Sequence, residues 1–184
     1  MKRLFTLLAT VVVLFHFSLT GTQASRENRA LAASLWPNSL CARSEQVIFS
    51  CAVKREGSRQ STANKLASLC ASRKLSKEEG YLQYRFGQPG KVELEYPNTR
   101  TGTQQLFTYT HYMRYQVDLT EIWFTVDNNQ YQIFDTYNGE EKRVVSQEGV
   151  SVKLPDGVKD VTFVCRTKVK ADYSMLADVL KVNE

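Results

Sequence analysis

The chain has 184 residues, with 24 lysines and arginines against 19 aspartates and glutamates, and a formal net charge of +5 at pH 7. This length favours one domain with a substantial core. The charge surplus is small and its basic residues are scattered, which argues against nucleic-acid binding, because such proteins gather basic residues on one face.

The first residues have the order of a secretory signal peptide. Lys2 and Arg3 precede an apolar run over residues 4–17, and Thr22 and Ala24 place small residues around a cleavage site. The run is too short to span a bilayer comfortably, so we expect cleavage after residue 24 rather than a membrane anchor. No later run reaches transmembrane length. The mature protein is therefore expected in the periplasm or outside the cell.

The chain divides into three parts by composition. Residues 1–24 form the expected signal peptide. Residues 25–44 are an Ala-rich N-terminal segment that we expect to be partly helical, with Trp36 and Pro37 ending the helix. Residues 45–184 are expected to form a single β domain with a short C-terminal helix.

Short runs of aromatic and β-branched residues, separated by turn residues, fill the chain beyond residue 45. They predict strands at residues 47–53, 66–71, 81–86, 92–96, 106–117, 121–126, 131–137, 142–146, 150–154 and 159–167. About 8–10 strands without helices between them predict an all-β fold, either an antiparallel β-sandwich or an open barrel. Residues 172–182 carry apolar side chains at helical spacing and predict a short amphipathic helix.

Four cysteines lie beyond the expected cleavage site, and an oxidising compartment favours their pairing. Because no Cys-x-x-Cys spacing occurs and His111 is the single histidine of the mature chain, we expect no metal site. We predict two disulfides, one joining Cys51 to Cys70 and the other joining Cys41 to Cys165. The first would close a hairpin, and the second would tie the N-terminal segment to the last strand.

The sequence contains no catalytic motif, and we expect no catalytic residue and no cofactor. Alternation along residues 106–117 directs His111 toward the core, so we interpret it as a hydrogen-bonded, half-buried residue rather than a catalyst or ligand. Paired carboxylates stay open as an alternative, because a glycosidase needs only two acidic residues. The carboxylates concerned are Glu93, Glu95, Asp135 and Glu140.

Four aromatic and basic residues are candidates for a binding surface. Nine tyrosines, nine phenylalanines and two tryptophans exceed what one modest core needs. Alternation places Tyr112 and Arg114 on the outer sheet face, where they form either a contact patch or ordinary cross-strand pairs. Trp123 lies opposite the neighbouring apolar residues, so it is either partly exposed or covered by a second layer. Tyr131, beside a predicted hairpin turn, completes the set.

Two resemblances add expectations. Residues 80–87, Gly-Tyr-Leu-Gln-Tyr-Arg-Phe-Gly, and residues 89–97, Pro-Gly-Lys-Val-Glu-Leu-Glu-Tyr-Pro, resemble a family of small secreted, mostly uncharacterised bacterial proteins. That resemblance spans residues 49–165 and implies no chemistry. More distantly, a secreted, disulfide-bearing, all-β chain is similar to periplasmic lysozyme inhibitors, including the invertebrate-type class. Those inhibitors insert a Ser-Gly-containing loop with a nearby tyrosine into the enzyme cleft, and the nearest hairpin here is residues 128–131.

These features predict a secreted or periplasmic protein-binding module, in its most specific form an inhibitor of a hydrolase such as a lysozyme. An envelope structural or stress-protective protein without enzymatic activity is one alternative, and a carbohydrate-active enzyme is another. We expect a secreted or periplasmic protein as partner, no nucleic acid and no membrane span. The protein itself is expected to be a monomer or a homodimer.

Overall fold

The computed structural model describes residues 35–58, 64–155, 160–166 and 170–182. The expected signal peptide and residues 25–34 lie outside the described residues. Residues 35–44, the described part of the N-terminal segment, form turns and one isolated bridge between Leu35 and Ala42. Among the described helices, none has the length and apolar character needed to cross a membrane.

Strands make up most of the described chain, which confirms the all-β expectation. The strands are β1 (Glu45–Arg55), β2 (Leu66–Ser72), β3 (Leu82–Gln88), β4 (Lys91–Tyr96), β5 (Thr108–Arg114), β6 (Val117–Val126), β7 (Asn129–Asn138), β8 (Val145–Lys153), β9 (Val161–Cys165), β10 (Lys170–Ala171) and β11 (Lys181–Val182). The described chain also has a 3-10 turn, η1 (Thr103–Leu106), and one turn of α-helix, α2 (Leu176–Val179).

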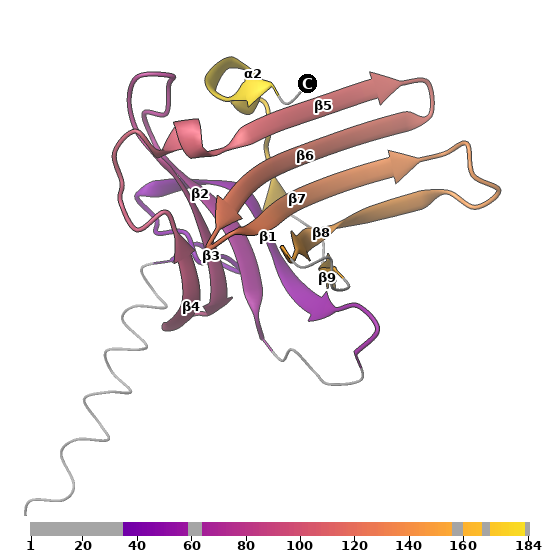
Figure 1. The fold of residues 1–184 in the computed structure, drawn as a ribbon, viewed down its shortest axis with the longest axis horizontal. Coiled ribbons are helices and arrows are strands. Elements are labelled where there is room, and N and C mark those ends of the chain that lie inside the picture. The colour runs from indigo at the N-terminus through magenta and orange to yellow at the C-terminus, as the bar shows by residue number, and fades with distance from the viewer. Residues whose placement is uncertain (1–34, 59–63, 156–159, 167–169, 183–184) are drawn as a thin grey trace, which may run out of the picture.

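The strands join a single curled sheet that forms a half-barrel (Figure 1). Their order is β11-β5-β6-β7-β8-β9-β1-β2-β3-β4, and β10 pairs with β1 beside this path. Neighbours are antiparallel, except that β11 runs parallel to β5. β1 pairs with β2 over most of its length and with β9 at its last three residues, so it connects the two halves of the sheet.

The core lies inside the curl. Cross-strand pairing places Tyr109, Ile122, Ile133 and Val150 in one row across β5 to β8. These residues belong to the same buried cluster as apolar residues of β1, β2 and β3. The ring of Tyr84 on β3 lies 5.0 Å from the ring of Phe124 on β6, between their centroids. Apolar side chains from both halves of the sheet thus fill the interior, as the alternating pattern of the strands requires.

The predicted cysteine pairing is wrong. The disulfides join Cys41 to Cys70 and Cys51 to Cys165. In the β1–β2 ladder Cys51 lies opposite Ala67, and Cys70 is three positions farther along β2. An odd separation in a strand points side chains to opposite faces, so Cys70 cannot reach Cys51. Cys165 lies opposite Val53, two residues from Cys51 and on the same face of the sheet.

Three element boundaries also differ from the prediction. The run 106–117 ends at a turn over Tyr115 and Gln116, and Val117 already begins β6. Gln116 adopts a positive φ of 59° without any glycine, asparagine or proline in the turn to signal it. Residues 145–153 form one strand where two were predicted, and the expected C-terminal helix is the single turn α2 followed by β11.

Candidate functional site

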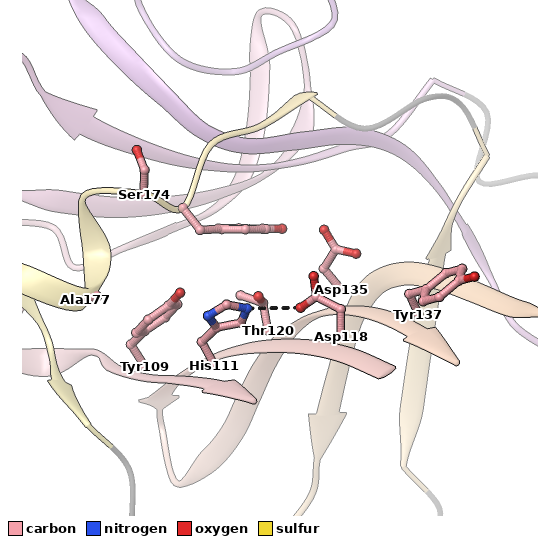
Figure 2. A pocket seen from close by; sticks show the side chains of 9 residues that line it. Tyr109, His111, Asp118, Thr120, Asp135, Tyr137, Ser174 and Ala177 are labelled. Atoms are coloured by element: carbon pink, nitrogen blue, oxygen red, sulfur yellow. Dashed lines mark hydrogen bonds and ion pairs between the residues drawn. The ribbon is translucent and has the colours of Figure 1, made fainter. Parts of the chain in front are cut away.

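A pocket of about 370 Å³ lies on the inner face of the half-barrel, beyond the apolar core. β5, β6 and β7 form one wall, and the C-terminal segment with Tyr173, Ser174 and Ala177 forms the other. Figure 2 shows Ser174 and Ala177 across the pocket from His111 and Asp118. Binding sites commonly occur at the mouths of barrels, and the volume is within their usual range.

The strand register explains why polar groups gather here. The row next to the buried apolar row consists of His111, Thr120, Asp135 and Glu148, one from each of β5 to β8. Because residues two apart in a strand share a face, this row points to the same side as the core. Asp118 follows in the next row, opposite Tyr137. The inner face therefore changes from apolar to acidic toward the ends of these strands.

His111 and Asp118 are joined by a hydrogen bond. The Nε2 atom of His111 lies 3.0 Å from Oδ1 of Asp118, and the two side chains are 40% and 52% exposed (Figure 2). The interpretation of His111 as a hydrogen-bonded, half-buried residue agrees with this pair, but its side chain points into the pocket rather than into the core. The alternation correctly predicted that the His111 side chain points to the inner face of the sheet. At this position the strands extend beyond the apolar core, so the inner face borders the pocket.

The surroundings of Asp135 and Glu148 disfavour the ionised form of both carboxyl groups. Burial raises the pKa of Asp135, and the nearby Asp118 raises it further. Burial also raises the pKa of Glu148, with an added contribution from Asp135. In the part of the chain that the structure describes, no lysine or arginine lines the pocket. Its negative charge is thus incompletely compensated.

Tyr173 closes the pocket from the C-terminal side. Burial raises the pKa of its hydroxyl, and the carboxylates of Asp135 and Glu148 raise it further. The hydroxyl oxygen is shielded from solvent and makes no hydrogen bond of acceptable geometry to a described residue. Asp135 nevertheless lies near enough for each of the two groups to shift the pKa of the other.

Exposed apolar side chains lie beside the pocket, at the ends of the β5–β6 and β7–β8 hairpins. Tyr115 is 83% exposed, Met113 70%, Val144 61% and Tyr137 43%. Met113 and Tyr137 flank Asp118 in one cross-strand row. We call these four residues the open end.

The two hairpins of the open end are joined to each other. The Gly139 N–H donates to the Gln116 carbonyl oxygen at 2.7 Å. Arg114 binds the carboxylate of Glu140 with both terminal nitrogens, and its Nη2 donates to Oε2 at 2.6 Å. The hairpin ends therefore form one continuous surface rather than two separate tips.

The four predicted binding residues do not form one site. Tyr112 and Arg114 lie together on the outer face near the end of β5. Trp123 lies farther along that face, where its Nε1 donates to Glu121 and the ammonium of Lys153 lies 4.8 Å from its ring centroid. Tyr131 lies inside the half-barrel, with its ring stacked 5.1 Å from that of Phe124.

The carboxylates noted from the sequence also separate. Glu93 pairs with Lys65 at 2.8 Å, Glu95 with Arg85 at 3.0 Å, and Glu140 with Arg114. Asp135 alone among them lies in the pocket. Asp118, Thr120, Glu148 and Tyr173 were missed. The sequence does contain a signal for Asp118 and Thr120. Both alternate with the same period as Ile122 and Phe124, so they point to the same side of β6 as these core residues although they are polar.

A metal centre has little support in the described residues. The single group with three ligand atoms close together is Cys41, Glu45 and Cys70. Both cysteines are joined to each other in a disulfide, so their sulfurs are not available as thiolate ligands.

No protein-family model, curated protein or solved structure matches the chain. The family and inhibitor resemblances noted from the sequence stay predictions.

Proposed function

We propose that this chain is an exported protein-binding module and that the open end of the half-barrel, with the adjoining pocket, is its contact surface. The observation that carries this proposal is the exposure of Met113, Tyr115, Tyr137 and Val144 on two joined hairpins. Large apolar side chains gathered on one surface are typical of interaction sites, because contact with a partner removes them from water. Tyrosine in particular is enriched at interface centres.

The disulfides support export. All cysteines of the described residues are paired, and one pair closes a loop of 114 residues. Such bonds form and persist in oxidising compartments and are rare in the cytosol. The periplasm and the cell exterior both meet this condition, so we propose one of these compartments for the mature protein.

We further propose a hydrolase, such as a lysozyme, as the partner. The turn over Tyr115 and Gln116 presents the most exposed tyrosine at the end of a hairpin. Two joined hairpin ends supported by a rigid sheet are suited to contact the cleft of an enzyme, since their backbone is already ordered before binding.

Capture from the native extracytoplasmic fraction tests the proposal. The bait is the mature protein, compared with the double variant Met113→Ser/Tyr115→Ser. Val92→Ser is the matched control, because Val92 is also exposed but lies on β4 at the far edge of the sheet. We expect wild type and the control to retain one hydrolase and the double variant to lose it. Inhibition assays against a panel of lysozymes then identify the enzyme class.

The proposal fails if no protein is retained, or if the double variant retains the same proteins as wild type. A deletion strain whose only defect is a fragile envelope, with the double variant restoring it fully, would favour the structural alternative.

A second candidate function is acid–base catalysis on a glycan. It is favoured by the placement of Asp135, with its raised pKa, beside the Asp118–His111 pair. Carboxylates in different environments can divide the roles of acid and base. Screening the wild type for glycan hydrolysis tests this function. Activity that Asp135→Asn abolishes would support it, and inactivity on every glycan would end it.

A further inference from the structure

We infer that the pocket receives a positively charged side chain, a lysine ammonium or an arginine guanidinium, from the partner protein that contacts the open end. This inference rests on the proposed function and specifies the chemistry of the partner.

Charge complementarity is the first argument. Asp118, Asp135 and Glu148 project from three adjacent strands to one face. Asp135 and Glu148 are directly opposite each other, about 5 Å apart, so their like charges repel. Asp118 is diagonal to Asp135 and raises its pKa. The other titratable groups that line the pocket are His111, Tyr109, Tyr137 and Tyr173, and none of the described residues lining it is a lysine or arginine. A cation entering the pocket would offset this repulsion.

The tyrosines supply a second, independent argument. Tyr109, Tyr137 and Tyr173 line the same space. Aromatic rings attract cations through their electron-rich faces, more strongly where water is excluded. The Tyr173 hydroxyl is shielded from solvent and lies beside Asp135, and a hydroxyl can both donate and accept. A guanidinium or ammonium N–H reaching Asp135 would also be able to donate to this oxygen.

The arrangement fits a side chain better than a metal ion. Among the described residues, no three ligand atoms of this pocket lie within 4.8 Å of one another. A calcium ion needs several protein oxygens at roughly 2.3–2.6 Å, and these side chains do not form such a shell as they stand. Several N–H donors at the end of a long side chain can bridge such a spread.

The open end explains how a long side chain would be directed inward. Met113 and Tyr137 flank Asp118 at the entrance. Lysine and arginine have apolar stems that lie along such residues while the charged group continues to polar surroundings. The stem would thus contact the open end, and the charge would reach Asp118 and Asp135.

The test is an NMR titration of the mature protein with three probes: Nα-acetyl-arginine methylamide, Nα-acetyl-lysine methylamide, and the matching citrulline compound. Citrulline has the shape of arginine without its charge. We expect the cationic probes to shift amide signals of β5, β6 and β7. The citrulline compound should bind at least about tenfold more weakly than the arginine probe, because it cannot make charge-assisted hydrogen bonds. Absence of binding by both cationic probes, or equal binding by citrulline, overturns the inference.

Variants locate the site. Asp135→Asn/Glu148→Gln should weaken arginine-probe binding by about tenfold. Glu79→Gln, which removes the same kind of charge from an exposed residue outside the pocket, should not. Equal effects of the two changes overturn the assignment to the pocket. Dispersed amide spectra show that each variant is folded, and the arginine–citrulline contrast in wild type needs no variant.

Partner capture separates this inference from the proposed function. If Met113→Ser/Tyr115→Ser loses the partner while Asp135→Asn/Glu148→Gln retains it at full affinity, the proposed function stands and the inference fails. If neither variant loses a partner, the proposed function fails. A dimer in sedimentation experiments that Asp135→Asn dissociates would place a second copy in the pocket and overturn the assignment to another protein.

Discussion

Arg85 and Glu45 form a buried ion pair that holds the N-terminal segment against β3. Nη1 of Arg85 donates to Oε2 of Glu45 at 2.7 Å, and Nη2 donates to Oε1 at 2.8 Å. The two side chains are 4% and 1% exposed. Nη1 also donates to the carbonyl oxygen of Leu40 at 2.9 Å. Burial alone would raise the pKa of Glu45, but the hydrogen bonds and charge of Arg85 outweigh it and lower that pKa.

Replacement of Glu45 should therefore be strongly destabilising. Glu45→Gln removes the buried counter-charge of the Arg85 guanidinium and leaves only the partly exposed Glu95 beside it. We expect the free energy of unfolding to fall by about 3–5 kcal/mol. Urea denaturation at pH 7 measures it. Glu93→Gln is the control, because its pair with Lys65 is partly exposed and should contribute at most about 1 kcal/mol. Equal losses in the two variants would contradict the role of the buried pair.

The two disulfides should differ in their contribution to stability. Cys51 and Cys165 are 114 residues apart, whereas Cys41 and Cys70 are 29 residues apart. In the chain-entropy model these loops correspond to about 4.8 and about 3.6 kcal/mol. We expect Cys51→Ser/Cys165→Ser to lower the free energy of unfolding more than Cys41→Ser/Cys70→Ser. Denaturant titrations measure the difference, and the opposite order would count against the model. Peptide mapping without reductant checks the pairing itself.

Removing the charge of Asp135 should stabilise the protein at neutral pH. Its pKa is raised in the folded state by burial and by Asp118, so its ionised form is disfavoured there. The resulting loss of stability is fully present above the folded pKa and disappears as the pH falls through that pKa toward the unfolded value. Asp135→Asn should thus raise the free energy of unfolding at pH 7 and leave it nearly unchanged at about pH 3, where both states are protonated.

Urea denaturation of wild type and Asp135→Asn at the two pH values measures this effect. Glu79→Gln serves as the reference for a carboxylate that lies outside the pocket. A variant that is less stable than wild type at pH 7 would contradict the prediction and show that the neighbouring Tyr173 hydroxyl outweighs burial and Asp118.

Binding of a cationic probe should weaken on acidification. Asp135 and Glu148 attract a cation only when ionised, and their raised pKa values bring protonation to a higher pH than for free carboxylates. Affinity for the arginine probe should therefore fall as the pH drops through these pKa values. His111 also faces the pocket, so the titration is repeated with His111→Asn. A pH-independent affinity in both proteins would contradict the prediction.

The prediction from sequence was most accurate where it depended on neighbours in the chain. Alternation in residues 121–126 places Ile122 and Phe124 inward and Trp123 outward, as the structure has them. The same rule fails at a turn without turn residues, as at Gln116, because nothing local signals its positive φ. The alternation rule also predicted the direction of the His111 side chain, but it did not show that the apolar core ends at Tyr109, one inward position before His111.

The sequence by itself determined that the chain is built of strands and which side chains share a face, because both depend on residues one or two positions apart. Only the tertiary structure decided which strands are neighbours and in what register. That register joins Cys51 to Cys165 across 114 residues, brings His111, Asp118 and Asp135 to one pocket, and places Glu148 opposite Asp135. The physical reason is that cross-strand contacts depend on how the whole sheet curls around its core, which no local pattern specifies.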